Sequence, residues 1–131
     1  MISYQKNIPL KANEIAGVFD SSGIKRPTDD LPRIQKMFDH ADITISAWDE
    51  DKLIGVCRAL TDFSYCCYLS DLAVAAPYQK QGIGHTMINY LKKEIGDEVT
   101  LILLAAPKAM SYYPKIGFEA IYNGFIIHRA R

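Results

Sequence analysis

The sequence has few cysteines, no excess charge of either sign and no long apolar run, and each absence excludes a class of protein. Cys57, Cys66 and Cys67 form no disulfide framework and no zinc-binding pattern, which indicates a reducing, cytoplasmic location and no metal. The 15 basic and 15 acidic side chains balance, which argues against general binding to nucleic acid or to an anionic membrane. The longest apolar run, residues 99–107, is far below the roughly 20 residues that a membrane-spanning helix needs.

The composition is that of an ordinary globular domain. Of the 131 residues, 49% are hydrophobic and 23% are charged, and this length suffices for one apolar core without crosslinks. No repeat, low-complexity tract or linker divides the chain, and residues 1–6 lack the charged-then-apolar pattern of a signal peptide. We therefore expect residues 1–131 to form a single domain.

The periodicity of the apolar residues predicts a series of short strands and helices. Strands are expected over residues 2–6, 43–48, 53–60, 65–74, 99–105, 119–122 and 125–129, and helices over 13–19, 31–38, 82–95 and 108–115. The segment 99–105 is the most apolar and is expected to be buried on both faces. A helix between two strands implies a parallel crossover, whereas short turns imply antiparallel pairs. The expected fold is α/β, with a mostly antiparallel central sheet flanked by helices and closed by a hairpin that turns at Asn123-Gly124.

Residues 79–84 carry the pattern that says most about chemistry. Gly82 and Gly84 open the predicted helix soon after a strand ends at Val74. The first amides of a helix have no partner within it, the helix dipole adds partial positive charge, and glycines let this backbone approach a phosphate. This loop pattern favours an anion-binding site. The alternative is a flexible glycine-containing turn that binds no ligand. It matches neither the Walker phosphate loop nor the three-glycine dinucleotide fingerprint.

Two motifs together resemble a known superfamily. The segment Leu72–Gly84, which ends in Q-x-x-G-x-G, resembles the acetyl-CoA-binding motif of the GCN5-related N-acetyltransferase (GNAT) superfamily. The segment Tyr112–Phe118, Y-Y-P-K-I-G-F, resembles its second signature, aromatic-Tyr-x-Lys-hydrophobic-Gly-Phe. The motifs occur in the family's order and spacing, and the predicted order of elements matches over residues 1–131.

This resemblance implies a GNAT-like acyl-CoA N-acyltransferase fold and transfer of acetyl from acetyl-CoA to a primary amine. In such enzymes the strand that ends here at Val74 diverges from the next strand, and the pantetheine arm pairs with the backbone exposed in the gap. The pyrophosphate accepts hydrogen bonds from the amides at the start of the following helix. The residues implied in cofactor binding are Leu72, Ala73, Val74, Gln79, Lys80, Gln81, Gly82, Ile83, Gly84 and His85.

The resemblance also indicates two candidate catalytic residues. Tyr113 matches the tyrosine that many members place near the cofactor sulfur, where a phenol with an unperturbed pKa of about 10 can protonate the leaving thiolate. The alternative is a core or pocket tyrosine, because Pro114 and Ala106 depart from the Glu and Asn common in the family, and proline disfavours helical geometry at the preceding residue. Asp71 is a candidate base or proton-wire member, with a structural hydrogen-bonding role as its alternative. Ordered water can also take the proton of the amine.

The acceptor is a small-molecule or peptide amine whose identity the sequence leaves open. The region expected to face it, residues 19–40, carries charges of both signs. A non-catalytic acyl-CoA-binding sensor or regulatory module is the alternative function. The resemblance further implies a homodimer formed through sheet edges or C-terminal strands, for which the apolar residues 125–127 are suited, although they equally suit the core.

Overall fold

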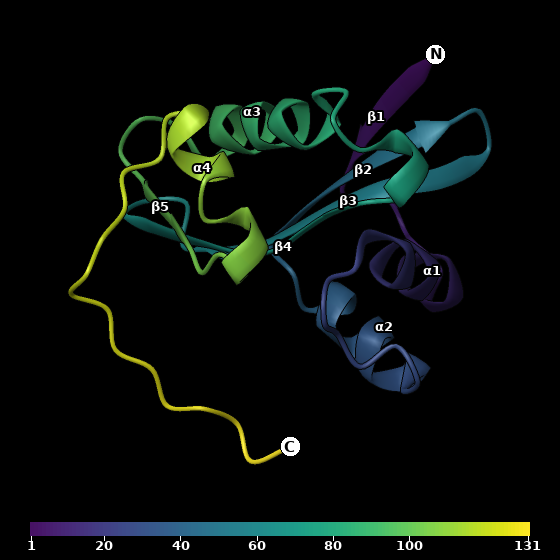
Figure 1. The fold of residues 1–131 in the computed structure, drawn as a ribbon, viewed down its shortest axis with the longest axis horizontal. Coiled ribbons are helices and arrows are strands. Elements are labelled where there is room, and N and C mark those ends of the chain that lie inside the picture. The colour runs from purple at the N-terminus through teal and green to yellow at the C-terminus, as the bar shows by residue number, and fades with distance from the viewer.

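The structure is a computed structural model and describes all of residues 1–131. Helices and strands follow one another in the predicted order as far as residue 115 (Figure 1). The strands are β1 (Ile2–Lys6), β2 (Ile43–Asp49), β3 (Lys52–Thr61), β4 (Cys66–Val74) and β5 (Thr100–Leu103). The helices are α1 (Ala12–Ser22), α2 (Leu31–Asp39), α3 (Ile83–Ile95) and α4 (Tyr112–Lys115), with short 3-10 turns at Ala76–Tyr78 and Pro107–Ala109.

One five-stranded sheet, in the order β1-β2-β3-β4-β5, forms the centre of the molecule. The first four strands pair antiparallel with their neighbours in sequence, and β5 pairs parallel with β4. The helix α3 joins β4 to β5 and covers one face of the sheet, while α1 and α2 lie against the other face (Figure 1). The mixed sheet flanked by helices confirms the predicted fold class.

Each face of the sheet has its own apolar cluster. The side of α3 that meets the sheet carries the residues predicted from the helical periodicity, Ile83, Met87, Ile88, Leu91 and Ile95. On the other face, α1 and α2 contribute Ile15, Val18, Phe19, Ile34 and Phe38. Gly23 ends α1 in a left-handed conformation with φ of +86°, and the Asp30 carboxylate accepts a hydrogen bond from the Arg33 amide at the start of α2. No helix is both long enough and apolar enough to cross a membrane.

The C-terminal part of the chain differs from the prediction. No strand follows β5, and residues 119–131 run as an extended segment away from the body (Figure 1), so the predicted closing hairpin is wrong. A two-residue type I′ turn needs positive φ at both central residues. Neither Asn123 nor Gly124 has a positive φ, so the turn is open. The strand expected over 99–105 is shorter than predicted and half-exposed, because β5 has no neighbour on its outer edge.

Candidate active site

The strand β4 loses one of its two neighbours half-way along its length. It pairs with β5 from Cys66, opposite Thr100, as far as Leu69, opposite Leu103. Beyond that point β4 continues to Val74 with a strand neighbour only on the β3 side. The structure therefore contains the divergence that the sequence resemblance implied, and the second half of β4 has backbone groups with no strand to pair with.

A β-bulge marks the point where the strands diverge. Arg58 lies opposite Asp71 and Ala59 lies opposite Leu69, which leaves Ser70 without a partner on β3. An extra residue on one strand bends that strand and shifts the alternation of its side chains. The β4 side chains that face α3 accordingly change from odd-numbered positions before the bulge to even-numbered positions after it.

The loop that follows β4 brings unpaired amides to the start of α3. Gly82 caps the helix with φ of +82°, and Lys80 also has a left-handed backbone, with φ of +65°. The first hydrogen bond of α3 runs from the Thr86 amide to the Gly82 carbonyl at 3.0 Å, so the amides of residues 83–85 have no partner within the helix. No side chain caps this end, and no acidic residue lies in the first turn. The arrangement suits a bound anion.

Gly84 lies where three parts of the site meet. A Cβ placed on Gly84 would be 3.5 Å from the Tyr112 hydroxyl, 3.7 Å from Leu72 Cδ2 and 3.9 Å from Val74 Cγ2. The open half of β4, the start of α3 and the start of α4 are therefore side by side. Sequence reasoning did not single out Tyr112, although it is the aromatic residue that opens the second motif.

The remaining predicted cofactor residues take different positions around this point. The Gln79 side chain holds the loop against β4, because its Nε2 donates to the Val74 carbonyl at 2.8 Å. The side chains of Ala73 and Ile83 are buried in the two apolar clusters, which leaves only their main-chain groups for a ligand. The side chains of Lys80, Gln81 and His85 are exposed.

Tyr113 is half-buried against the α3 side of the core. Its ring lies edge-on to Phe118, with centroids 5.4 Å apart, and to Tyr112, with centroids 5.2 Å apart. Burial raises the pKa of its hydroxyl, and the neighbouring Tyr112 and Cys57 raise it further, so the phenol keeps its proton at neutral pH. Pro114 does not break α4, because it lies in the first turn, where the missing amide costs no hydrogen bond. The acid role of Tyr113 stays a prediction.

The carboxylate of Asp71 is buried and held by two arginines. Arg26 Nε donates to one oxygen at 2.5 Å, and Arg58 Nε donates to the other. Both guanidinium groups also bond to Ser70, Arg26 through the Ser70 carbonyl at 2.8 Å and Arg58 through the Ser70 hydroxyl at 2.9 Å. These contacts tie the segment between α1 and α2 to the bulge of β4. They fit the structural alternative for Asp71, since both carboxylate oxygens bond to arginine and the side chain is fully buried.

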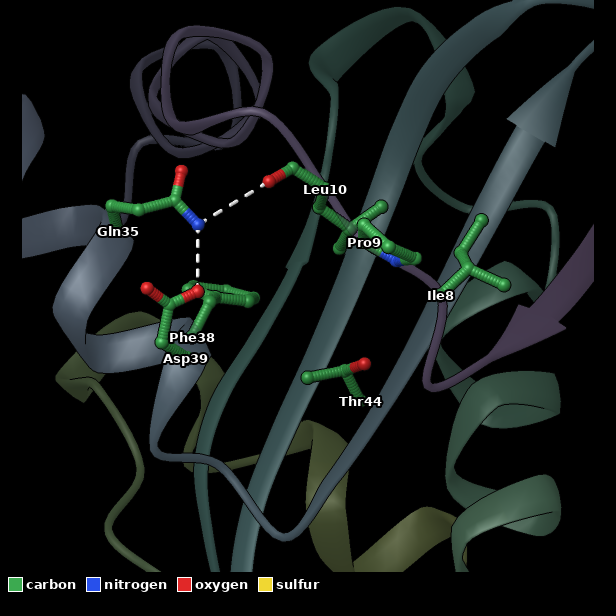
Figure 2. Close-up of a pocket in the computed structure, with 7 residues that line it drawn as sticks. All are labelled: Ile8, Pro9, Leu10, Gln35, Phe38, Asp39 and Thr44. Carbon is green, nitrogen blue, oxygen red and sulfur yellow. Dashed lines mark hydrogen bonds between the residues drawn. The ribbon is translucent and has the colours of Figure 1, made fainter.

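A small hollow on the α1–α2 face of the sheet lacks these features. Figure 2 shows it between α2, β2 and the segment that follows β1, with Gln35 and Asp39 at one side. The Gln35 amide already donates to the Asp39 carboxylate at 2.9 Å and to the Leu10 carbonyl at 3.5 Å. The volume of the hollow, about 90 Å³, is well below the roughly 300–1,000 Å³ usual for ligand pockets. No group of three or more His, Cys, Asp or Glu side chains could hold a metal ion.

Comparison with known protein families shows to which family this chain belongs. Residues 15–127 match the model of the acetyltransferase (GNAT) domain. The chain belongs to the GNAT family. An uncharacterized N-acetyltransferase, ycf52, of Porphyra purpurea is 30% identical over 124 residues, which cover 89% of this chain and 68% of that protein. GCN5-related N-acetyltransferase 2, a chloroplastic protein of Arabidopsis thaliana, is 33% identical over 80 residues, 57% of this chain and 30% of that protein.

Solved GNAT structures share the whole fold. A protein of meticillin-resistant Staphylococcus aureus, described as a probable acetyltransferase, is 24% identical and has a TM-score of 0.84, with 98% of this chain and 100% of that chain covered. The aminoglycoside N-acetyltransferase AAC(6')-Iy, solved with CoA, is 14% identical and has a TM-score of 0.74, with 100% and 96% covered. Family and fold together identify this chain as a GNAT acetyltransferase.

Proposed function

We propose that this GNAT protein transfers the acetyl group of acetyl-CoA to a primary amine by direct attack of the amine on the thioester. The observation that carries the proposal is the meeting, at Gly84, of the open half of β4 with the uncapped start of α3. The open half of β4 offers strand-like backbone pairing, and the start of α3 offers amides that can bind an anion. A pantetheine arm joined to a pyrophosphate needs both in this order.

Acetyl-CoA would supply the activated acetyl group, and the chain would supply its binding and orientation. The amides of Gly84 and its neighbours would bond to the pyrophosphate, and main-chain groups of Leu72, Ala73 and Val74 would bond to the pantetheine. Gly84 has no side chain, and a Cβ there would lie 3.5 Å from the Tyr112 hydroxyl, so its backbone lies close to both β4 and α4. The residues present therefore fit the co-substrate.

The chemical step needs few groups from the protein. The amine nitrogen forms a bond to the carbonyl carbon, the C–S bond breaks, and the sulfur leaves as a thiolate. A β4 amide near Leu72 or Val74 would stabilise the oxyanion in between. The Tyr113 hydroxyl, which its raised pKa keeps protonated, would donate a proton to the thiolate, and water would take the proton lost by the amine. Asp71 would act by positioning the bulge through its arginine contacts rather than as the base.

For the acceptor, we propose only a chemical class. Related proteins carry names that indicate different acceptors: an aminoglycoside acetyltransferase, a ribosomal-protein-alanine N-acetyltransferase and a histone acetyltransferase. The region between α1 and α2 borders the open half of β4 through Arg26 and contains charges of both signs. A small-molecule or peptide amine thus stays the prediction, as do a cytoplasmic location and the absence of nucleic-acid and membrane partners.

Release of free CoA thiol from acetyl-CoA in the presence of a panel of amines tests the proposal. The panel should contain an aminoglycoside, a peptide with a free N-terminal alanine, a lysine-containing histone-tail peptide and a simple polyamine. We expect turnover with at least one amine and none without an amine. Saturable CoA binding with no turnover on any amine would instead support a non-catalytic acyl-CoA-binding module.

A further inference from the structure

Arg58 carries a buried guanidinium group that the protein pairs only in part. The side chain is 10% exposed, its Nε donates to the Asp71 carboxylate, and its Nη2 donates to the Ser70 hydroxyl at 2.9 Å. The third nitrogen, Nη1, makes no hydrogen bond, whereas every buried side-chain nitrogen and oxygen has a partner. Nη1 therefore reaches the surface from an otherwise buried side chain, with two N–H groups free to donate.

This nitrogen lies where β4 loses its second neighbour. Ser70 is the first residue of β4 beyond the pairing with β5, which ends at Leu69, opposite Leu103. The hydrogen bond from Nη2 to the Ser70 hydroxyl holds the Arg58 guanidinium at this point. The ring of Phe38 on α2 packs against the same group, with its centroid 5.6 Å from Arg58 Cζ, and restricts its orientation. The unpaired nitrogen thus borders the open half of β4.

The cluster around Asp71 has more positive than negative charge. The guanidinium groups of Arg26 and Arg58 share the one Asp71 carboxylate, and neither of them has a second ion pair. Removing a charge from water is costly unless an opposite charge or hydrogen bonds replace the water, so deeply buried charges are usually paired. One positive charge is left over here, and a ligand with a single negative charge would balance it.

The pyrophosphate of CoA would lie on the other face of the sheet. The start of α3 lies beside Leu72 and Val74, whose side chains belong to the apolar cluster on the α3 face. Arg58 contacts Phe38, which belongs to the cluster on the α1–α2 face. The sheet therefore separates the Arg58 guanidinium from the α3 amides. In the proposed reaction, the ligand that remains for this face is the acceptor.

We propose that Arg58, together with Ser70, binds a carboxylate of the acceptor, so that the acceptor is an amine that also bears a carboxylate. The identity of this ligand as the acceptor rests on the acetyl transfer proposed above. Nη1 donates to one carboxylate oxygen, and the Ser70 hydroxyl, whose oxygen already accepts from Nη2, donates its hydrogen to the other. A carboxylate balances the single remaining charge, whereas a phosphate group, with a charge of about −1.5 to −2, exceeds it. A polyamine or an aminoglycoside brings further positive charge to this cluster and is a poor acceptor.

Pairs of acceptors that differ only in the carboxylate test the assignment. A series of ω-amino acids from glycine to ε-aminocaproate, each beside its amide, places the carboxylate at increasing distances from the amine. For at least one chain length, we expect kcat/KM for the acid to exceed that for the amide by about 10-fold or more, the effect of one charge-assisted hydrogen bond. Equal kcat/KM values at every length, or turnover confined to amines without a carboxylate, would leave acetyl transfer intact and overturn the carboxylate site.

Binding of the acetylated products separates this site from the proposed reaction. Titration calorimetry with the N-acetyl ω-amino acids and with their amides, in the presence and absence of CoA, needs no turnover. We expect an acid to bind about 10-fold or more tightly than its amide. If no amine is acetylated and the acids still bind more tightly, acetyl transfer fails and the carboxylate site stands. No difference in affinity at any length would show that Nη1 is only hydrated, and would overturn the site.

Three variants locate the preference for the acid. Arg58→Lys keeps a positive charge beside Asp71 but has one nitrogen in place of a fork, so it cannot hold Asp71, Ser70 and a ligand together, and the preference should fall below about 3-fold. Ser70→Ala removes one donor, leaves both ion pairs in place and should also reduce the preference, so it serves if Arg58→Lys does not fold. Arg33→Lys is the matched control, since Arg33 is an exposed residue of α2 that bonds to neither Asp71 nor Ser70, and it should keep the full preference. A full preference in both Arg58→Lys and Ser70→Ala would place the carboxylate elsewhere and overturn the proposal.

Discussion

Replacement of Gly84 by alanine should stabilise the protein and weaken its binding of CoA. Gly84 is the second residue of α3, its φ is not positive, and the nearest atom to an added Cβ is the Tyr112 hydroxyl at an ordinary contact distance of 3.5 Å. The free protein has room for the methyl group, and alanine favours a helix over glycine by up to about 1 kcal/mol. For a chain of this size the gain corresponds to a rise in Tm of about 4 °C.

In the proposed complex, the same methyl group would take up space beside the Tyr112 hydroxyl, Leu72 and Val74, where the open half of β4 meets the α3 amides that would hold the pyrophosphate. Loss of one charge-assisted hydrogen bond costs about 1.5–3 kcal/mol, which is a factor of roughly 10 to 150 in the dissociation constant for CoA. Thermal unfolding gives the first effect, and isothermal titration with CoA gives the second. A normal CoA affinity in Gly84→Ala would refute the placement of the phosphates.

Two further glycines make the test specific. Gly17 lies in α1 with no atom within 4 Å of an added Cβ, so Gly17→Ala should raise Tm in the same way and leave CoA affinity unchanged. Gly82 has φ of +82°, where a side chain costs about 1–2 kcal/mol, so Gly82→Ala should lower Tm and also weaken CoA binding. Only a ligand at the start of α3 predicts this combination.

Other perturbations test the remaining parts of the site. Tyr113→Phe should lower kcat at least about 10-fold with little change in CoA affinity, whereas Tyr112→Phe should mainly weaken CoA binding; steady-state kinetics and titration separate the two. Asp71→Ala should lower the free energy of unfolding in urea by about 3–5 kcal/mol, because it leaves two guanidinium groups without their carboxylate. The control Glu94→Ala removes an exposed ion pair with Lys6 and should cost less than about 1 kcal/mol. Burial raises the pKa of the Cys57 thiol, so the folded state retains a proton that the unfolded chain loses above about pH 8.5. The free energy of unfolding should therefore fall between about pH 8 and 10, and Cys57→Ala should reduce that fall. An unchanged pH dependence in this variant would contradict the buried thiol as its source.

Local pattern was sufficient for most elements of this fold. The apolar periodicity of residues 82–95 predicted both the limits of α3 and the face that it buries, because a helix repeats its contacts every three or four residues. The glycines at 82 and 84 predicted the start of a helix, and the structure places Gly82 at the N-cap of α3 and Gly84 beside Leu72 and Val74 of β4. These features depend on neighbours in sequence.

Features that depend on distant neighbours needed the tertiary structure. Asp71 meets Arg26 and Arg58, which are 45 and 13 residues away, so its burial between two cations has no local signal. The second motif identified Tyr113, but packing decided that the Tyr112 hydroxyl lies beside Gly84.

The C-terminal segment shows most clearly the difference between what local sequence predicts and what the tertiary structure decides. The alternation of residues 119–129 and the Asn123-Gly124 pair predicted a hairpin, because local sequence favours both strands and the turn between them. A strand is stable only when it pairs with the edge of another strand. The sequence by itself therefore determined only that residues 125–129 favour an extended conformation. The tertiary structure decided that they do not join the sheet, since the turn at Asn123-Gly124 is open and β5 has no neighbour on its outer edge.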